Sequence, residues 1–109
     1  MSFVTWGFES LPAYNIMTDH KLKTWPDPFH AMWEGLKTFE LRKDDRGFQV
    51  GDTLLLQEWD SSIRRPYTGA WIRATVIFIL QSGPFPGLES GHVIMSILIT
   101  GKGRAMCCK

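Results

Sequence analysis

The 109-residue chain has few cysteines, almost no net charge and no long apolar run, and each absence excludes a class of protein. Its two cysteines, Cys107 and Cys108, are adjacent, a spacing that strains a disulfide between them. They are interpreted as free thiols of a flexible tail in a reducing cytoplasm. The longest apolar stretch, 74–80, is too short to cross a bilayer, and residues 1–9 lack the pattern of a signal peptide.

Charge and motif content exclude further classes. Twelve Lys and Arg against eleven Asp and Glu leave a net charge of +1, so binding to nucleic acid would need a local basic patch. The chain has no phosphate-binding loop and no dinucleotide fingerprint. No two of its three histidines stand at ligand spacing with a carboxylate or cysteine, so neither a metal nor a cofactor is expected. We also expect no membrane association.

The pattern of apolar residues predicts one mostly β (α+β) domain. Asp27-Pro28 starts a short helix with an apolar stripe at Phe29, Met32, Trp33 and Leu36, and Gly35 ends it. Alternation predicts strands at 20–25, 38–42, 53–59, 70–80 and 92–100. About five strands and one helix packed at one end are typical of a small β-barrel.

Three segments follow from this pattern. Residues 1–18 form an arm whose Trp6 and Phe8 we expect to pack on the domain, residues 19–100 form the domain, and residues 101–109 are a loose tail. The apolar arm is also a candidate surface for a protein partner.

Alternation also predicts the side chains that point inward. Phe39 and Leu41 are expected inside, with Thr38, Glu40 and Arg42 together on the opposite face. In the long strand, the residues expected on the inner face are Ile72, Ala74, Val76, Phe78 and Leu80.

The densest polar cluster follows the helix. It consists of Lys37, Thr38, Glu40 and Arg42, with His20 and Lys23 before it and Arg46 after it. A carboxylate two residues from an arginine on one strand face can hold the guanidinium in a pose that recognises phosphate or a base edge. The same residues are also consistent with an ordinary solvated strand face.

The remaining aromatic and basic residues have two interpretations each. Trp25, beside the cluster, could stack on a base or pack in the core. Trp33 is assigned to the core, and His30 and His92 to the solvated surface. The basic residues Arg64, Arg65 and Arg73 near a hairpin are consistent with a solvated loop or with phosphate contacts.

The motif G-x-K-x-x-E-x-R at 35–42 resembles the ASCH branch of the PUA-like superfamily. Within it, the chain is most similar to a small phage and bacterial domain family of unknown function. The landmarks at 20–26, 50–52, 67–69 and 92–97 extend this likeness over 19–99.

The resemblance implies a PUA-like barrel with a cleft, beside the helix, that binds RNA or a modified nucleotide. The superfamily motif residues are Gly35, Lys37, Glu40 and Arg42, and the narrower family pattern adds His20, Lys23, Asp45 and Arg46. We therefore predict a nucleic-acid-binding module, with Glu40 orienting Arg42 and accepting a hydrogen bond from an exocyclic amine.

The resemblance also implies two enzymatic alternatives. One ASCH branch hydrolyses N4-acetylcytidine with the motif lysine, a threonine three places on and a distant glutamate. Here Lys37 is present, but Glu40 stands three places on and the threonine is Thr38, while Glu58 or Glu89 could supply the distant carboxylate. A ribonuclease would use His20 and Lys37 as its acid and base.

Overall fold

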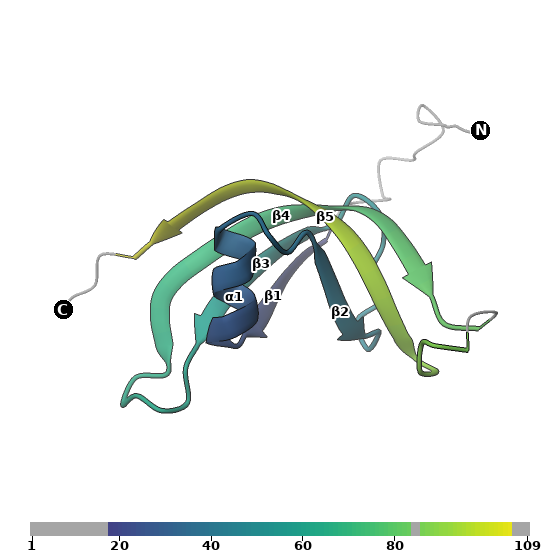
Figure 1. Ribbon diagram of the computed structural model, residues 1–109. Helices are drawn as coiled ribbons and strands as arrows, with labels where there is room; N and C mark the ends of the chain where they lie inside the picture. Colours follow the sequence, from purple (N-terminus) through teal and green to yellow (C-terminus); the bar gives the residue numbers. More distant parts are fainter. Residues whose placement is uncertain (1–17, 84–85, 106–109) are drawn as a thin grey trace.

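Five strands form one curled sheet with the order β1-β3-β4-β5-β2 in the computed structural model, which describes residues 18–83 and 86–105. The sheet curls into a half-barrel, and the helix lies on its concave side (Figure 1). β1 runs parallel to β3, and the other pairs are antiparallel. The elements are β1 (Asp19–Thr24), α1 (Pro26–Trp33), β2 (Phe39–Lys43), β3 (Thr53–Trp59), β4 (Tyr67–Gln81) and β5 (His92–Arg104).

This architecture confirms the prediction of a mostly β domain with five strands and one short helix. Residues 1–17 of the predicted arm, together with Cys107 and Cys108, lie outside the described residues. Among the described residues, no helix is long and apolar enough to cross a membrane.

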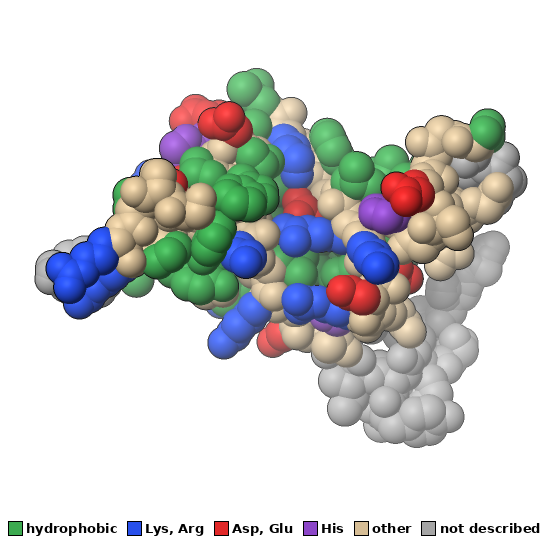
Figure 2. All heavy atoms as spheres, turned by 90° about the horizontal axis from the view of Figure 1, so that it is seen from below, with side chains coloured by type: hydrophobic (Ala, Val, Ile, Leu, Met, Phe, Trp, Pro, Cys, Tyr) green, Lys and Arg blue, Asp and Glu red, His purple; other side chains and the backbone are tan. Residues whose placement is uncertain are grey.

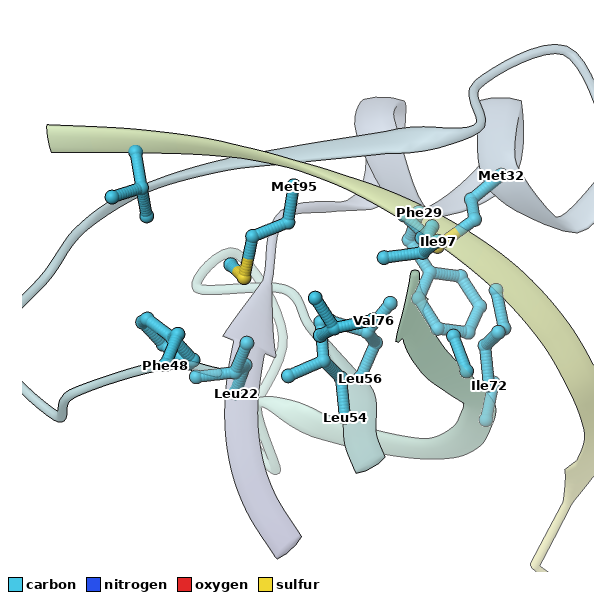
Figure 3. Packing of buried hydrophobic residues seen from close by; sticks show 13 residues of the cluster. Leu22, Phe29, Met32, Phe48, Leu54, Leu56, Ile72, Val76, Met95 and Ile97 are labelled. Carbon is cyan, nitrogen blue, oxygen red and sulfur yellow. The ribbon is translucent and has the colours of Figure 1, made fainter. Parts of the chain in front are cut away.

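The hydrophobic core extends along the sheet from Phe29 and Met32 of α1 at one end to Phe48 and Leu22 at the other (Figure 3). Leu54 and Leu56 of β3 alternate with half-buried neighbours, as the sequence pattern predicts. Phe29 and Met32 bring one side of α1 into the same cluster. The other fully or nearly fully buried members are Leu22, Phe48, Ala70, Ile72, Ala74, Val76, Val93, Met95 and Ile97.

The helix ends in a turn that depends on Gly35. The Leu36 amide donates to the Ala31 carbonyl at 2.8 Å and the Gly35 amide to the Met32 carbonyl at 3.0 Å. This is the Schellman arrangement, with Gly35 at φ +81°. The prediction that Gly35 ends the helix is confirmed, but the predicted stripe is wrong at Leu36, which is past the turn and 82% exposed.

We expect Gly35→Ala to lower the free energy of unfolding by about 1 kcal/mol, because an L-residue is strained in the left-handed region. A Cβ at this position would meet no atom within 4 Å, so the strain is confined to the backbone. Urea denaturation would measure it. Gly87→Ala, which also adds a Cβ in open space but at no positive φ, should leave the midpoint unchanged or raise it. Equal losses in the two variants would contradict this interpretation of the turn.

The inner face of β2 differs from the prediction. Glu40 is buried and only 3% exposed, whereas Phe39 and Leu41 are about half exposed. Alternation correctly grouped these residues by face, but the charged set points inward. It can do so because two cations neutralise the Glu40 carboxylate, as described below.

Two further predictions are wrong in the long strands. A register shift between Val76 and Phe78 turns Phe78 outward, and Ile79 packs against the core instead. The predicted loose tail is ordered strand as far as Arg104, paired with β4 up to Ala70.

The extension of β5 has a physical cause in its alternating sequence. On one face, Gly101 and Gly103 lie against the Trp71 ring, where a Cβ on Gly103 would come within 2.9 Å of the indole. On the other face, Lys102 Nζ and Arg104 Cζ each lie 4.7 Å from the centre of the Trp33 ring. Glycines under one indole and cations over another therefore stabilise these four residues.

Candidate functional site

A hollow of about 370 Å³ lies where β1 ends, α1 begins and β2 passes by. It is lined by Lys23, Thr24, Trp25, Pro28, Lys37, Phe39, Glu40, Leu41 and Arg42. We call this site the hollow. Seen from the concave side, Lys and Arg side chains gather in the middle of the molecule, with hydrophobic side chains beside them (Figure 2).

Glu40 lies at the centre of a charge cluster with Lys37 and Arg42. Lys37 Nζ donates to Glu40 Oε1 at 2.9 Å and to the Phe39 carbonyl at 2.6 Å. Arg42 Nε donates to Glu40 Oε2 at 2.6 Å. Each carboxylate oxygen therefore has its own cation, which fixes both cationic groups in position.

The local sequence builds this charge cluster. The Schellman turn after α1 directs the chain into β2, because the amide of Lys37 also donates to the Ala31 carbonyl, at 3.1 Å. Glu40 and Arg42 then lie two residues apart and share one face of the strand. Lys37, just before the strand, reaches the same carboxylate from its other side.

The gap between the edge strands β1 and β2 is bridged by two arginines. Arg42 Nη2 donates to the Lys23 carbonyl at 2.9 Å, and Arg46 Nη1 donates to the Lys21 carbonyl at 3.0 Å. In the part of the chain that the structure describes, no further strand pairs with this edge of β1, and the two arginines satisfy backbone groups that an edge strand would otherwise offer to other chains. Arg42 thus has two roles, since it also lines the hollow.

Aromatic side chains stand at the rim of the hollow. Trp25 is 55% exposed and packs edge-to-face on Trp59, with ring centres 5.1 Å apart. Lys23 Nζ lies 4.2 Å from the centre of the Trp59 ring. Phe39 is 46% exposed, with Lys37 Nζ at 4.8 Å from its ring centre. Two exposed aromatic side chains therefore stand at the rim, Phe39 beside the fixed Lys37 ammonium group and Trp25 against Trp59.

The structure brings together five of the residues that the sequence singled out. Lys23, Trp25, Lys37, Glu40 and Arg42 all line the hollow. Sequence reasoning missed Thr24, Pro28, Phe39 and Leu41 as lining residues. The two apolar β2 residues were missed because they were assigned to the core.

Three other predicted residues lie outside the hollow. Asp45 and Arg46 line a smaller neighbouring hollow of about 150 Å³, on the far side of Arg42. Thr38 is exposed, and its carbonyl accepts from the Ile97 amide at 3.1 Å. The threonine considered for the hydrolase alternative therefore does not line the hollow, whereas Lys37 does.

His20 is buried on the opposite side of β1 from Lys21 and Lys23 and does not line the hollow. Its Nε2 lies 2.9 Å from Asp52 Oδ2, and its ring packs edge-to-face on Phe48. Because an ionised carboxylate can only accept, Nε2 carries the hydrogen. The position of His20 indicates a structural role.

Asp52, the residue just before β3, accepts three hydrogen bonds. Besides His20, the Thr18 amide donates to it at 3.1 Å and the Gln49 amide at 2.9 Å. Burial alone raises the pKa of this carboxyl, but the hydrogen bonds and the nearby His20 outweigh it, so the pKa of Asp52 lies below its ordinary value.

A third buried carboxylate, Glu58, connects α1 to the sheet. Its Oε2 lies 2.9 Å from His30 Nε2, and its Oε1 accepts from the Thr68 hydroxyl at 2.8 Å. Glu58 does not line the hollow, and Glu89, the other carboxylate considered from the sequence, is exposed in a loop.

The fold and the hollow together define a class of protein: a half-barrel domain with a charged, aromatic-rimmed hollow beside its open edge. Residues 19–97 match a family described as a domain of unknown function (DUF3850), and the chain belongs to this family. It is also similar to a protein of Escherichia phage P2 named "Uncharacterized 12.9 kDa protein in GpA 3'region", with 37% identity over 57 residues. That match covers 52% of this chain, which spans about half the length of the phage protein.

Proposed function

We propose that the hollow binds one nucleotide, either free or as part of a short single-stranded RNA. The observation that supports this most strongly is the charge cluster, in which Glu40 holds the donors of Lys37 and Arg42 next to two exposed aromatic side chains. Fixed cations suit the acceptor atoms of a phosphate or base, and an exposed indole suits the face of a base.

Size and charge favour a small or single-stranded ligand over a duplex. The volume of about 370 Å³ lies near the lower end of small-molecule sites, which span roughly 300–1,000 Å³. The hollow has three cationic side chains and one carboxylate, a local excess of two positive charges, whereas the whole chain carries only +1. Few backbone phosphates can therefore be neutralised.

The resemblance of the motif at 35–42 to the ASCH branch of the PUA-like superfamily supports the same proposal. That superfamily is associated with RNA and modified nucleotides bound in a cleft beside the helix. In the proposed complex, Lys37 and Arg42 hydrogen-bond to the ligand, Trp25 stacks on a base, and Lys23 lies near the backbone.

The salt dependence of binding to a short single-stranded RNA tests this proposal. With one cation, Lys23, near the backbone, log K should fall against log salt with a slope of about −0.7. Lys37→Met should weaken binding about tenfold or more by removing a charge-assisted hydrogen bond to the ligand, with little change in the slope. Binding measured by fluorescence anisotropy at salt concentrations from about 20 to 200 mM would give this slope.

Arg73→Gln provides the control, because it also removes one positive charge but lies exposed beside Trp71, away from the hollow. It should keep the affinity and the slope of the parent. Absence of binding at low salt, a slope near zero, or equal losses in the two variants would overturn the proposal.

A further inference from the structure

The hollow presents hydrogen-bond donors, and its one carboxylate is already occupied. Among the nine lining residues, Glu40 is the only anionic side chain, and Lys37 and Arg42 engage its two oxygens at 2.9 and 2.6 Å. The nearby carbonyls of Phe39 and Lys23 accept from the same two cations. These acceptors already face cations, and the Glu40 side chain is only 4% exposed, so a ligand that needs to donate hydrogen bonds has little access to them.

Several donors of the charge cluster remain for a ligand. The Lys37 ammonium has three hydrogens and makes two hydrogen bonds within the described residues. Arg42 uses Nε and Nη2, while its Nη1 group, with two hydrogens, makes no hydrogen bond to a described residue. The Thr24 hydroxyl lies 3.4 Å from Arg42 Nη2 and can accept from it while keeping its own hydrogen to donate.

We propose that the hollow selects bases with a carbonyl group at purine position 6 or pyrimidine position 4 (guanine and uracil) over bases with an amino group there (adenine and cytosine). This inference rests on the proposed function. Guanine offers two adjacent acceptors, O6 and N7, to the free donors of Lys37 and Arg42. The amino group of adenine or cytosine would bring a donor against these cations, leaving buried polar groups without partners.

The aromatic rim strengthens the inference, because stacking contributes affinity without choosing a base. Every base has a π-face, so contact with Trp25 or Phe39 tolerates all four. Discrimination therefore depends on the hydrogen-bonding groups of the charge cluster. Glu40 orients the donors and is not placed to read an exocyclic amine, because its side chain is only 4% exposed and each oxygen already pairs with a cation.

Binding of unphosphorylated nucleosides tests the inference without the competing acceptors of phosphate. By calorimetry or competition, inosine should bind about tenfold or more tightly than adenosine, because the two differ mainly in carrying a carbonyl or an amino group at position 6. Guanosine and uridine should exceed adenosine and cytidine in the same direction. Lys37→Met should reduce the inosine preference to about twofold, while Lys43→Met, on the exposed side of β2, should retain it.

The outcomes separate the inference from the proposed function. Equal affinity for inosine and adenosine, with measurable binding of both, would overturn the inference and leave the proposed function intact. Binding of all 5′-monophosphates and of inorganic phosphate, but of no nucleoside, would also overturn it, since the donors would then hold the anion. Absence of any nucleoside, nucleotide or RNA binding would overturn both.

Discussion

Glu40→Ala is expected to abolish measurable nucleotide binding and to lower the free energy of unfolding by about 2–4 kcal/mol. Glu40 is only 3% exposed and holds two cations, each through its own oxygen. Removing the carboxylate leaves the Lys37 and Arg42 cations close together with no counter-charge, and each loses the hydrogen bond that holds it toward the other. The loss of stability stays below that of a fully buried ion pair because both cations keep some contact with solvent.

Chemical denaturation and nucleotide titration together measure this prediction. Glu40→Gln keeps the size of the side chain but not its charge, so it should restore much of the stability and little of the binding. Glu89→Ala, which removes an exposed carboxylate, should change neither. If Glu40→Ala bound nucleotides like the parent, the charge cluster would have no part in recognition.

Asp52→Asn is expected to lower the free energy of unfolding by about 2–4 kcal/mol at neutral pH without changing ligand specificity. The carboxylate joins His20, the Thr18 amide and the Gln49 amide, and an amide cannot accept all three hydrogen bonds with equal strength. None of these groups lines the hollow. Thermal denaturation would measure the loss of stability, and a nucleoside titration of the same variant would measure its base preference. A lower stability with an unchanged preference would show that Asp52 has a structural role and no part in recognition.

The effect of Asp52 should depend on pH in a defined direction. Its pKa is lower in the folded protein than the ordinary value of 3.8, so its stabilising contribution is complete above that value. The contribution disappears as the pH falls through the lower, folded pKa. The difference in unfolding free energy between the parent and Asp52→Asn should therefore shrink from pH 6 to pH 2, and a difference that grew on acidification would contradict the assignment.

Much of the fold could be predicted because local patterns agree with it. The strand at 53–59 was predicted with its observed bounds, since alternating apolar residues between two turns leave little choice. Gly35 was predicted to end the helix because the left-handed turn favours glycine. Such features depend on the sequence within one element.

Features that depend on contacts between distant residues could not be predicted. Alternation shows which β2 residues share a face but not which face is inward, because that depends on the pairing of β2 with β5 and on the contact of Arg42 with the Lys23 carbonyl, 19 residues away. The register shift before Phe78 likewise depends on pairing with β5.

The candidate site was predicted in part for the same reason. The spacing of Lys37, Glu40 and Arg42 in the sequence already placed them together. By contrast, His20 was grouped with them, although its partner, Asp52, lies 32 residues along the chain. The alternation of Gly101-Lys102-Gly103-Arg104 is a pattern typical of a strand. Its contribution to stability could not be predicted, because it depends on contacts with the distant Trp71 and Trp33 rings.

The central claim is that a nucleotide occupies the hollow, and the indole N–H signals of the tryptophans test it most directly. In an NMR titration with guanosine monophosphate, the Trp25 signal should shift progressively, together with the side-chain signals of Arg42. The Trp71 signal should stay in place, because that indole lines a separate hollow of about 160 Å³ with Tyr67. A titration that moves Trp71 and leaves Trp25 and Arg42 unchanged would contradict the assignment of the site.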